Sequence, residues 1–90
     1  MTLDRWLTRQ NLREEDLAAE LRKAGISKAN QSTVNRLRTR YRNASLTLAL
    51  AVERATRGEV RAEELPLSRA TRRALAELRR VVRPGEGAAA

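Results

Sequence analysis

Apolar residues recur along this chain at intervals of three and four positions, which is the period of an amphipathic α-helix. Leu3, Trp6 and Leu7 have this spacing, and Thr2 before them is a capping residue, so the pattern predicts a first helix over 3–10. No run alternates β-branched and polar residues as a half-buried strand would. The hydrophobic pattern therefore indicates an all-α fold class.

A second helix is expected over 12–24. Asn11 and Glu14 have the spacing of a capping box, in which two side chains satisfy free N–H groups at a helix start. Gly25 is a natural end, because glycine adopts the left-handed conformation without strain. The expected inward-facing positions are Leu17, Ala18 and Leu21.

The third expected helix ends near Arg38 and has two possible starts. Ser27 and Asn30 are both good N-caps, so the helix begins at 28 or at 31. Its apolar positions are few and are Val34 and Leu37, with Ala29 if the helix starts early. So narrow an apolar stripe lets a helix pack along one edge and leaves the rest to solvent or a ligand.

The most apolar part of the chain follows. Residues 46–56, capped by Ser45, are apolar nearly all round and should form the central helix of the core. A turn or one-turn helix is expected over 60–65, before Pro66 breaks the chain.

A fifth helix is expected over 69–82, capped by Ser68. Its apolar stripe consists of Ala70, Ala74, Leu75, Leu78, Val81 and Val82. Such a stripe must be buried, either on its own domain or against the same helix of a second copy. The last residues, PGEGAAA (84–90), are expected to be disordered.

The composition argues against an enzyme. Ninety residues make one domain at most, with a thin core and little room for a catalytic cleft. The chain has no cysteine and no histidine, so it lacks the usual thiolate and imidazole metal ligands and the commonest general base. We expect no catalysis, no metal, no other cofactor and no small-molecule ligand.

The sequence gives no sign of a membrane segment. No apolar run approaches the roughly 18 residues that a transmembrane helix needs. The start, MTLDRWLTRQ, lacks the basic residues and the apolar stretch of a signal peptide. We expect a cytoplasmic, nucleoid-associated protein with no membrane contact.

The positive charge is concentrated in two blocks. Basic residues number 19 and acidic residues 11, a net charge of +8. Residues 27–43 contain five basic residues and no acid, and residues 68–83 contain six arginines and one glutamate, so each block carries +5. Two basic blocks on a small domain suit a polyanion such as nucleic acid. The alternative is a solubilising surface with no ligand.

The third expected helix has side chains suited to the DNA major groove. The groove admits one α-helix, and its base edges offer hydrogen-bond donors and acceptors. An arginine can donate to guanine O6 and N7, and a glutamine or asparagine can pair with adenine. The predicted base-contacting residues, on one face by i, i+4 spacing, are Gln31, Ser32, Asn35 and Arg36.

Basic residues at the end of this helix are predicted to contact phosphates, namely Arg38, Arg40 and Arg42. Two roles are open for Tyr41, which either donates its hydroxyl to a phosphate or packs under the loop. Alternatives also exist on the helix itself. Gln31 and Ser32 suit any polar helix start, and Arg36 could pair with an acid of the second helix.

Three pieces, DLAAEL (16–21), QSTVNRL (31–37) and SLTLALAVERATRGEV (45–60), together resemble the Cro/repressor-type helix-turn-helix regulators of phages and bacteria. The resemblance covers about residues 1–65. It implies a compact five-helix, lambda-repressor-like domain with helix 28–38 in the major groove. It also implies base contacts at the four positions named above, with Ala18 where the two helices touch and Val34 as an anchor. Thr33 matches a position that either contacts DNA or only packs.

The chain departs from the family pattern at two places. The connection RKAGISKAN (22–30) is longer than the family's, so either the second helix gains a turn or the connection is a true loop. Its basic residues would extend the phosphate-contacting surface or be solvated; they are Arg22, Lys23 and Lys28. A glycine usually follows the recognition helix in the family, and here Thr39 and Arg40 stand in its place.

The expected organisation is a helix-turn-helix domain over 1–66, a C-terminal helix over 67–83 and a disordered tail over 84–90. Helix-turn-helix proteins usually bind two half-sites as symmetric dimers. We therefore expect a homodimer whose interface includes Leu75, Leu78 and Val82. The alternative is that the last helix packs only within its own chain. A third option, compatible with either, is that the arginines on its flanks supply extra phosphate contacts.

The sequence thus predicts a sequence-specific transcriptional regulator, a repressor in the first instance, that binds double-stranded DNA. The runner-up is a protein-interaction module, such as an antitoxin-like or anti-regulator protein, with its essential contacts on the last helix. A non-specific nucleoid-type binder is the third possibility, and it predicts steep salt dependence without a preferred site.

Overall fold

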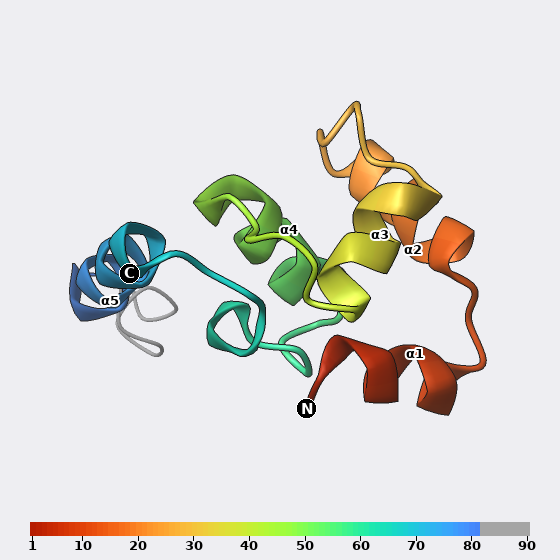
Figure 1. The fold of residues 1–90 in the computed structure, drawn as a ribbon, viewed down its shortest axis with the longest axis horizontal. Helices are drawn as coiled ribbons and strands as arrows, with labels where there is room; N and C mark the ends of the chain where they lie inside the picture. Colours follow the sequence, from red (N-terminus) through yellow and green to blue (C-terminus); the bar gives the residue numbers. More distant parts are fainter. Residues whose placement is uncertain (82–90) are drawn as a thin grey trace, which may run out of the picture.

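A computed structural model describes residues 1–81 as an all-helical chain, with no strand among them. In chain order the elements are α1 (Leu3–Gln10), α2 (Glu14–Lys23), α3 (Gln31–Arg38), α4 (Leu46–Ala55), the 3₁₀-helix η1 (Ala62–Glu64) and α5 (Arg69–Val81). Helices α1 to α4 form one body, and α5 lies at one end of it, beyond α4 and η1 (Figure 1). The all-α fold class is confirmed for these residues. The predicted disorder of 84–90 concerns residues outside the described part.

None of the helices in residues 1–81 has both the length and the apolar character required to cross a membrane.

The junction between α1 and α2 differs from the expectation. Asn11 adopts the left-handed conformation, with φ of 55°, and ends α1. α2 begins after Arg13, whose backbone N–H donates to the Asp16 carboxylate at 2.8 Å. The predicted capping box of Asn11 and Glu14 is therefore wrong. Asparagine is favoured both before a helix and, in the left-handed conformation, after one, and here the second use prevails.

Helices α1 to α4 all end with a residue in the left-handed conformation. These four residues are Asn11, Gly25, Arg40 and Arg57. After each of them, the next N–H returns to a carbonyl of the last helical turn at 2.8–3.0 Å. Only one of the four is glycine, and the left-handed conformation costs other residues about 1–2 kcal/mol. Arg40 and Arg57 therefore occupy strained positions.

The first three helices bury the side chains that the periodicity predicts. The buried residues of these helices are Leu3, Trp6, Leu7, Leu17, Ala18, Leu21, Val34 and Leu37. Val60 and Leu65, which flank η1, are also buried, as expected for residues that pack back on the body. Thr56 is buried with them, and its hydroxyl donates to the Val52 carbonyl at 2.9 Å and accepts the Val60 N–H at 3.1 Å.

Helix α4 is less enclosed than its apolar sequence suggests. It contacts α2, η1 and α5, so its central place is confirmed. Only Ala49 and Val52 are fully buried, however, while Leu46, Leu48 and Leu50 are half-buried. One side of α4 therefore remains partly open to solvent.

Helix α5 leaves most of its apolar stripe uncovered. Ser68 caps it, its hydroxyl oxygen accepting the Thr71 N–H at 3.1 Å, as predicted. Leu75 is 1% exposed, Leu78 is half-buried and Val81 is 75% exposed. Within the described part of the chain, α5 thus gives one fully buried side chain to the core.

Arginine side chains hold α5 on the body. Arg72 donates to the carbonyl oxygens of Glu63 at 3.1 Å and Leu65 at 3.4 Å. The Arg79 guanidinium donates to both carboxylate oxygens of Glu53 and, at 2.8 and 2.9 Å, to both of Glu63. Polar contacts therefore contribute much of the attachment of α5 to the body, since apolar packing contributes little.

Candidate nucleic-acid interface

Helix α3 packs against α2 and α1 along one narrow edge formed by Val34 and Leu37, both buried. Asn30 caps the helix, its Oδ1 accepting the Thr33 N–H at 3.0 Å. In return the Asn30 N–H donates to the Thr33 hydroxyl at 3.2 Å. The later of the two predicted starts is confirmed, and the range 28–38 is wrong because the reciprocal cap fixes the start at Gln31.

The four predicted base-contacting side chains lie on the open side of α3. Gln31, Ser32, Asn35 and Arg36 are all exposed. Arg36 has no acidic partner among residues 1–81, so the alternative of an ion pair with α2 is not found. The acids of α2 pair instead with Arg38, Arg22, Arg13 and Lys23. The guanidinium of Arg36 is therefore available to a ligand.

A carboxylate of α2 stands at the edge of this face. Glu14 accepts hydrogen bonds from Gln31 Nε2 at 3.3 Å and from Asn35 Nδ2 at 3.0 Å. The Glu14 side chain is only 12% exposed, because it lies between the two helices. Each amide turns its nitrogen toward α2, which leaves one N–H and the carbonyl oxygen for another partner.

Arg38 turns into the body, away from its predicted role. Its guanidinium donates to the Asp4 carboxylate of α1 and lies 3.7 Å from the Glu14 carboxylate. The side chain is 34% exposed. A phosphate contact by Arg38 would require these ion pairs to break, because two carboxylates already neutralise its charge. Arg38 instead joins α1, α2 and α3.

The segment after α3 carries exposed basic residues. Arg40 donates to the Glu64 carbonyl at 2.8 Å, so it also ties α3 to η1. Tyr41 is 73% exposed, and the Arg42 guanidinium lies 6.0 Å from the centre of its ring. Of the two roles open for Tyr41, packing under the loop is wrong because the ring is in solvent. Arg42 is exposed and has no acidic partner within residues 1–81.

The connection between α2 and α3 is a true loop of residues 24–30. Arg22 braces it, donating to the Ala29 carbonyl and to the Glu15 carboxylate, each at 2.8 Å. Arg22 is thus not simply solvated, and a phosphate contact by Arg22 would have to compete with its pair with Glu15. Lys28, on this loop, is exposed and has no acidic partner in the part of the chain that the structure describes.

The remaining predicted residues, one for DNA and three for the dimer interface, are partly or fully buried or lie outside the described residues. The Thr33 hydroxyl takes part in the cap of α3, and its side chain is half-buried, so packing is its observed role. Leu75, predicted at a dimer interface, is buried within its own chain and is not open to a second copy. Leu78 is half-buried, and Val82 lies outside the described residues.

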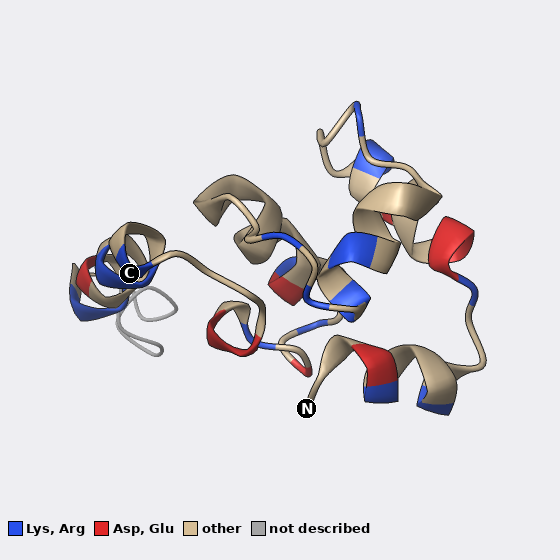
Figure 2. Cartoon of the chain, viewed as in Figure 1, with Lys and Arg blue, Asp and Glu red and all other residues tan. Residues whose placement is uncertain are grey.

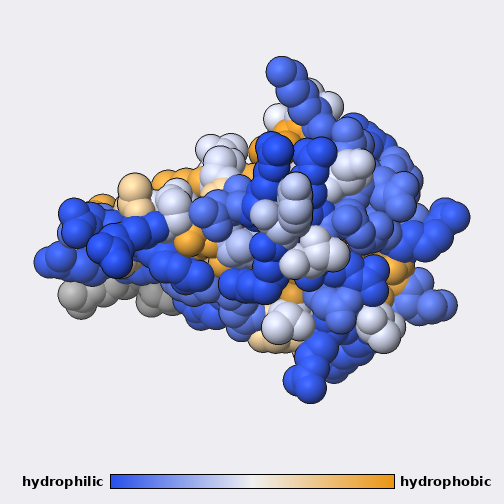
Figure 3. Space-filling view, in the orientation of Figure 1, coloured by the Kyte–Doolittle hydropathy of each residue, from blue (hydrophilic) through white to orange (hydrophobic). Residues whose placement is uncertain are grey.

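The two basic blocks are separate surfaces in space. Figure 2 shows the first on α3 and the segments beside it, with the acidic first turn of α2 close by. The second block lies on α5, at the other end of the molecule (Figure 2). In the same orientation the surface is largely hydrophilic (Figure 3). A long polyanion would meet α3 and α5 as distinct sites.

Sequence reasoning missed the two acids that organise the face of α3. Glu14 lies 17 positions before Gln31, and Asp4 lies 34 positions before Arg38. No periodicity links residues so far apart. The spacing of Glu14 from Asn11 also suggested a helix cap and gave no sign of a contact with α3. No group of three or more His, Cys, Asp or Glu side chains in residues 1–81 is arranged to hold a metal ion.

Comparison of the chain with protein-family models, with curated proteins and with solved structures finds no match. The function must therefore be argued from the residues and their geometry.

Proposed function

We propose that this chain is a sequence-specific transcriptional regulator of the helix-turn-helix type, which places α3 in the major groove of double-stranded DNA. The observation that carries the proposal is the open polar face of α3. Gln31, Asn35 and Arg36 are exposed there, while the helix is held by only two buried residues. A recognition helix needs this combination, since most of its circumference must enter the groove.

The proposed base contacts follow from the free hydrogen-bonding groups. Arg36 has two terminal nitrogens free to donate to guanine O6 and N7. Gln31 and Asn35 each keep a carbonyl oxygen and one N–H, which are the groups that adenine N6 and N7 require. Glu14 fixes both amides in one orientation, so they are positioned before DNA arrives. Ser32 supplies a smaller donor and acceptor beside them.

The proposed phosphate contacts lie at the two ends of α3. Lys28 precedes the helix and Arg42 follows it, and both are exposed with no acidic partner among residues 1–81. Tyr41 and Arg40 add a hydroxyl and a second guanidinium at the same end. Phosphate contacts supply affinity and register, whereas base contacts supply specificity. Occupation of an operator is by itself enough to block transcription, so we propose repression.

The first experiment is selection of bound duplexes from a random DNA pool with the full chain at physiological salt. An enriched motif supports the proposal, and two inverted half-sites would also support the predicted homodimer. Salt-sensitive binding without any enriched motif would contradict the proposal and would indicate a non-specific DNA-binding protein instead. Absence of binding would remove DNA as the ligand.

The selected duplex then allows the roles of single arginines to be separated. We expect Arg36→Ala to cost about 1–3 kcal/mol at one base pair and to relax specificity there. Arg42→Ala should weaken all duplexes alike and flatten the salt slope by about 1. Titrations of matched and single-mismatch duplexes at several salt concentrations measure both effects. Identical behaviour of the two variants would contradict the proposed division of roles.

A further inference from the structure

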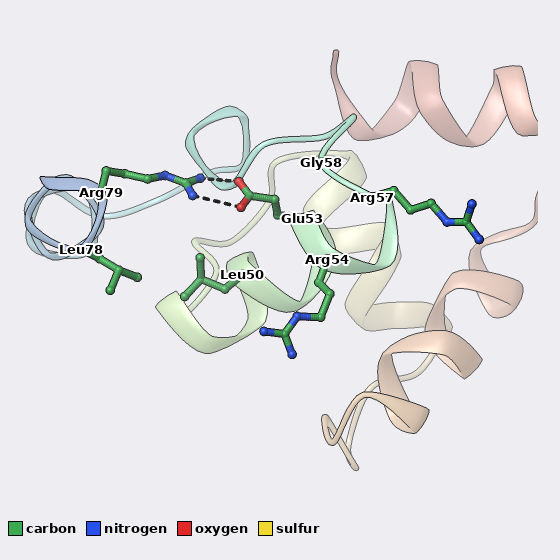
Figure 4. A pocket seen from close by; sticks show the side chains of 7 residues that line it. All are labelled: Leu50, Glu53, Arg54, Arg57, Gly58, Leu78 and Arg79. Atoms are coloured by element: carbon green, nitrogen blue, oxygen red, sulfur yellow. Dashed lines mark hydrogen bonds and ion pairs between the residues drawn. The ribbon is translucent and has the colours of Figure 1, made fainter. Parts of the chain in front are cut away.

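A hollow of about 570 Å³ lies between α4 and α5, and none of the residues proposed to contact DNA lines it. Leu50 of α4 and Leu78 of α5 point toward one another across it (Figure 4). Both side chains are half-buried, so each keeps apolar surface open to solvent. The hydrogen-bonded pair of Glu53 and Arg79 closes the hollow on one side (Figure 4). Its volume is within the range of ligand-binding clefts.

A second hollow of about 210 Å³ continues along α4 and shares Leu50 and Arg54 with the first. Residues of one stripe of α4 line it, at i, i+3, i+4 and i+7: Thr47, Leu50, Ala51 and Arg54. Ile26, in the turn after α2, forms its far wall. The two hollows adjoin at Leu50 and Arg54. We call the two together the α4 groove, defined by Ile26, Leu50, Ala51, Arg54, Arg57 and Leu78.

The charge at the rim of the α4 groove is positive. Arg54 and Arg57 are exposed and have no acidic partner within residues 1–81. In Figure 4 the Arg54 side chain extends from α4 beside Leu50, and the Arg57 side chain extends from the end of α4 in the direction away from α5. The one acid that lines the first hollow, Glu53, is already bonded to Arg79. An apolar floor with free arginines at its rim matches an apolar partner that carries carboxylates.

The charges argue against a second copy of this chain as the occupant. The exposed amphipathic helix that a second copy would offer is α5, which carries five arginines and one glutamate over Arg69–Val81. Inserting it would bring arginines against Arg54 and Arg57, and like charges at an interface are unfavourable. A nucleic acid would use the arginines but would leave the leucines without apolar contacts. No strand edge exists in residues 1–81, so a partner cannot add as a strand.

We propose that the α4 groove binds an acidic amphipathic helix of a partner protein. The apolar side chains of that helix, spaced i, i+3, i+4, insert between Leu50 and Leu78, and its flanking carboxylates pair with Arg54 and Arg57. The site uses no residue of the α3 face, so it stands whether or not α3 binds DNA.

The test uses the full chain and a fluorescein-labelled synthetic peptide of about 18 residues, long enough to form a helix. The peptide has leucines at i, i+3, i+4 and i+7 with glutamates on both flanks. A control peptide keeps the leucines and replaces every glutamate by lysine. Fluorescence anisotropy gives the affinity, and amide chemical-shift changes in NMR spectra locate the bound peptide.

We expect saturable binding of the acidic peptide, with shifts on α4 and α5. The double variant Arg54→Gln, Arg57→Asn should weaken binding about five- to tenfold, since two exposed ion pairs are lost. Arg36→Gln with Arg42→Gln removes the same charge elsewhere and should change it less than about twofold. Leu78→Ser should also weaken binding, with its fold checked by circular dichroism.

Four results would overturn the proposal. They are no saturable binding up to about 1 mM peptide, equal affinity for the lysine peptide, equal loss in the two double variants, and self-association through the groove. Sedimentation equilibrium of the chain alone detects the last, because Leu78→Ser would then dissociate a dimer. That result would support the homodimer predicted from the sequence.

Discussion

At the scale of single residues, the availability of each polar group near α3 is set by the acids beside it. Glu14 is bonded to Gln31 and Asn35, and Asp4 is bonded to Arg38. Arg36 lies on the same helix and has no such partner among residues 1–81. Two arginines two positions apart thus differ in their availability to a ligand, because carboxylates of other helices reach only one of them.

Glu14→Gln is expected to strengthen DNA binding, roughly threefold at low salt, because it removes a negative charge from the surface that we propose to face phosphates. The new amide has one carbonyl oxygen in place of two carboxylate oxygens, so it keeps the hydrogen bond from one neighbour. The amide of the other neighbour must turn its carbonyl oxygen toward the new NH₂ group. Anisotropy titrations of the selected duplex measure the change. Glu20→Gln, on the same helix but paired with Lys23, is the control and should have a smaller effect. If Glu14→Gln weakens binding, the carboxylate itself contributes to recognition.

Arg57→Gly is expected to stabilise the fold by about 0.5–1 kcal/mol, since glycine adopts the left-handed conformation without the strain that arginine carries. The φ of Arg57 is 56°, and no ion pair is lost among the described residues. Arg54→Gly, within α4, should instead destabilise by about 1 kcal/mol. Urea unfolding of the two variants provides the comparison. A loss of stability in both would mean that the Arg57 side chain contributes contacts.

At the scale of elements, α5 is attached to the body by ion pairs as much as by apolar packing. Hydrogen bonds from Arg79 lower the pKa of Glu63 from its ordinary value of 4.5 to about 2, and they also lower the pKa of Glu53. The same bonds raise the pKa of Arg79. Because the folded pKa of each carboxyl is depressed, the stabilisation is present above about pH 4.5 and is lost as the pH falls toward 2.

Arg79→Met should therefore lower the free energy of unfolding by about 1 kcal/mol at pH 7, as for a partly exposed ion-pair network. The difference from the parent chain should shrink between pH 4.5 and 2, while the carboxyl groups protonate. Urea unfolding at a series of pH values measures it. Arg80→Met, which removes an exposed pair with Glu77, is the matched control and should have little effect. A difference that stays constant with pH would rule out this linkage.

At the scale of the whole molecule, the excess of positive charge is concentrated on two surfaces, one at α3 and one at α5. The α3 surface combines free cations with polar side chains suited to base edges. The surface at α5 adjoins an apolar groove with its own free arginines. The described residues thus carry two surfaces of different chemistry, for which we propose DNA and an acidic protein helix as the respective partners.

Lys28→Gln with Arg42→Gln should reduce the slope of log K for DNA against log salt by about 2, because two phosphate contacts are lost. Arg69→Gln with Arg73→Gln removes the same charge from α5, where both arginines are exposed, and should leave the slope nearly unchanged. Binding titrations between low and physiological salt test this. Equal changes in the two double variants would show that DNA responds to net charge and not to the α3 surface.

The sequence alone was sufficient for the order of the helices and for the sides of α1, α2 and α3 that face inward. Leu3, Trp6 and Leu7 on α1, or Leu17 and Leu21 on α2, follow the helical period, and they are buried as predicted. The helix caps at Thr2, Ser45 and Ser68 were also predicted correctly from the sequence. These features depend on residues within one or two helical turns of one another, so they can be predicted from the local sequence.

The tertiary structure decided how the polar residues are used. That Arg38 is braced and Arg36 is free depends on where Asp4 and Glu14 lie in space, at separations of up to 34 positions. That α5 gives only Leu75 to the core, and leaves a groove beside α4, depends on how the helices pack together. Local patterns determine secondary structure through short-range periodicity. The availability of a charge or an apolar face is settled by contacts between distant segments, and no local pattern encodes those.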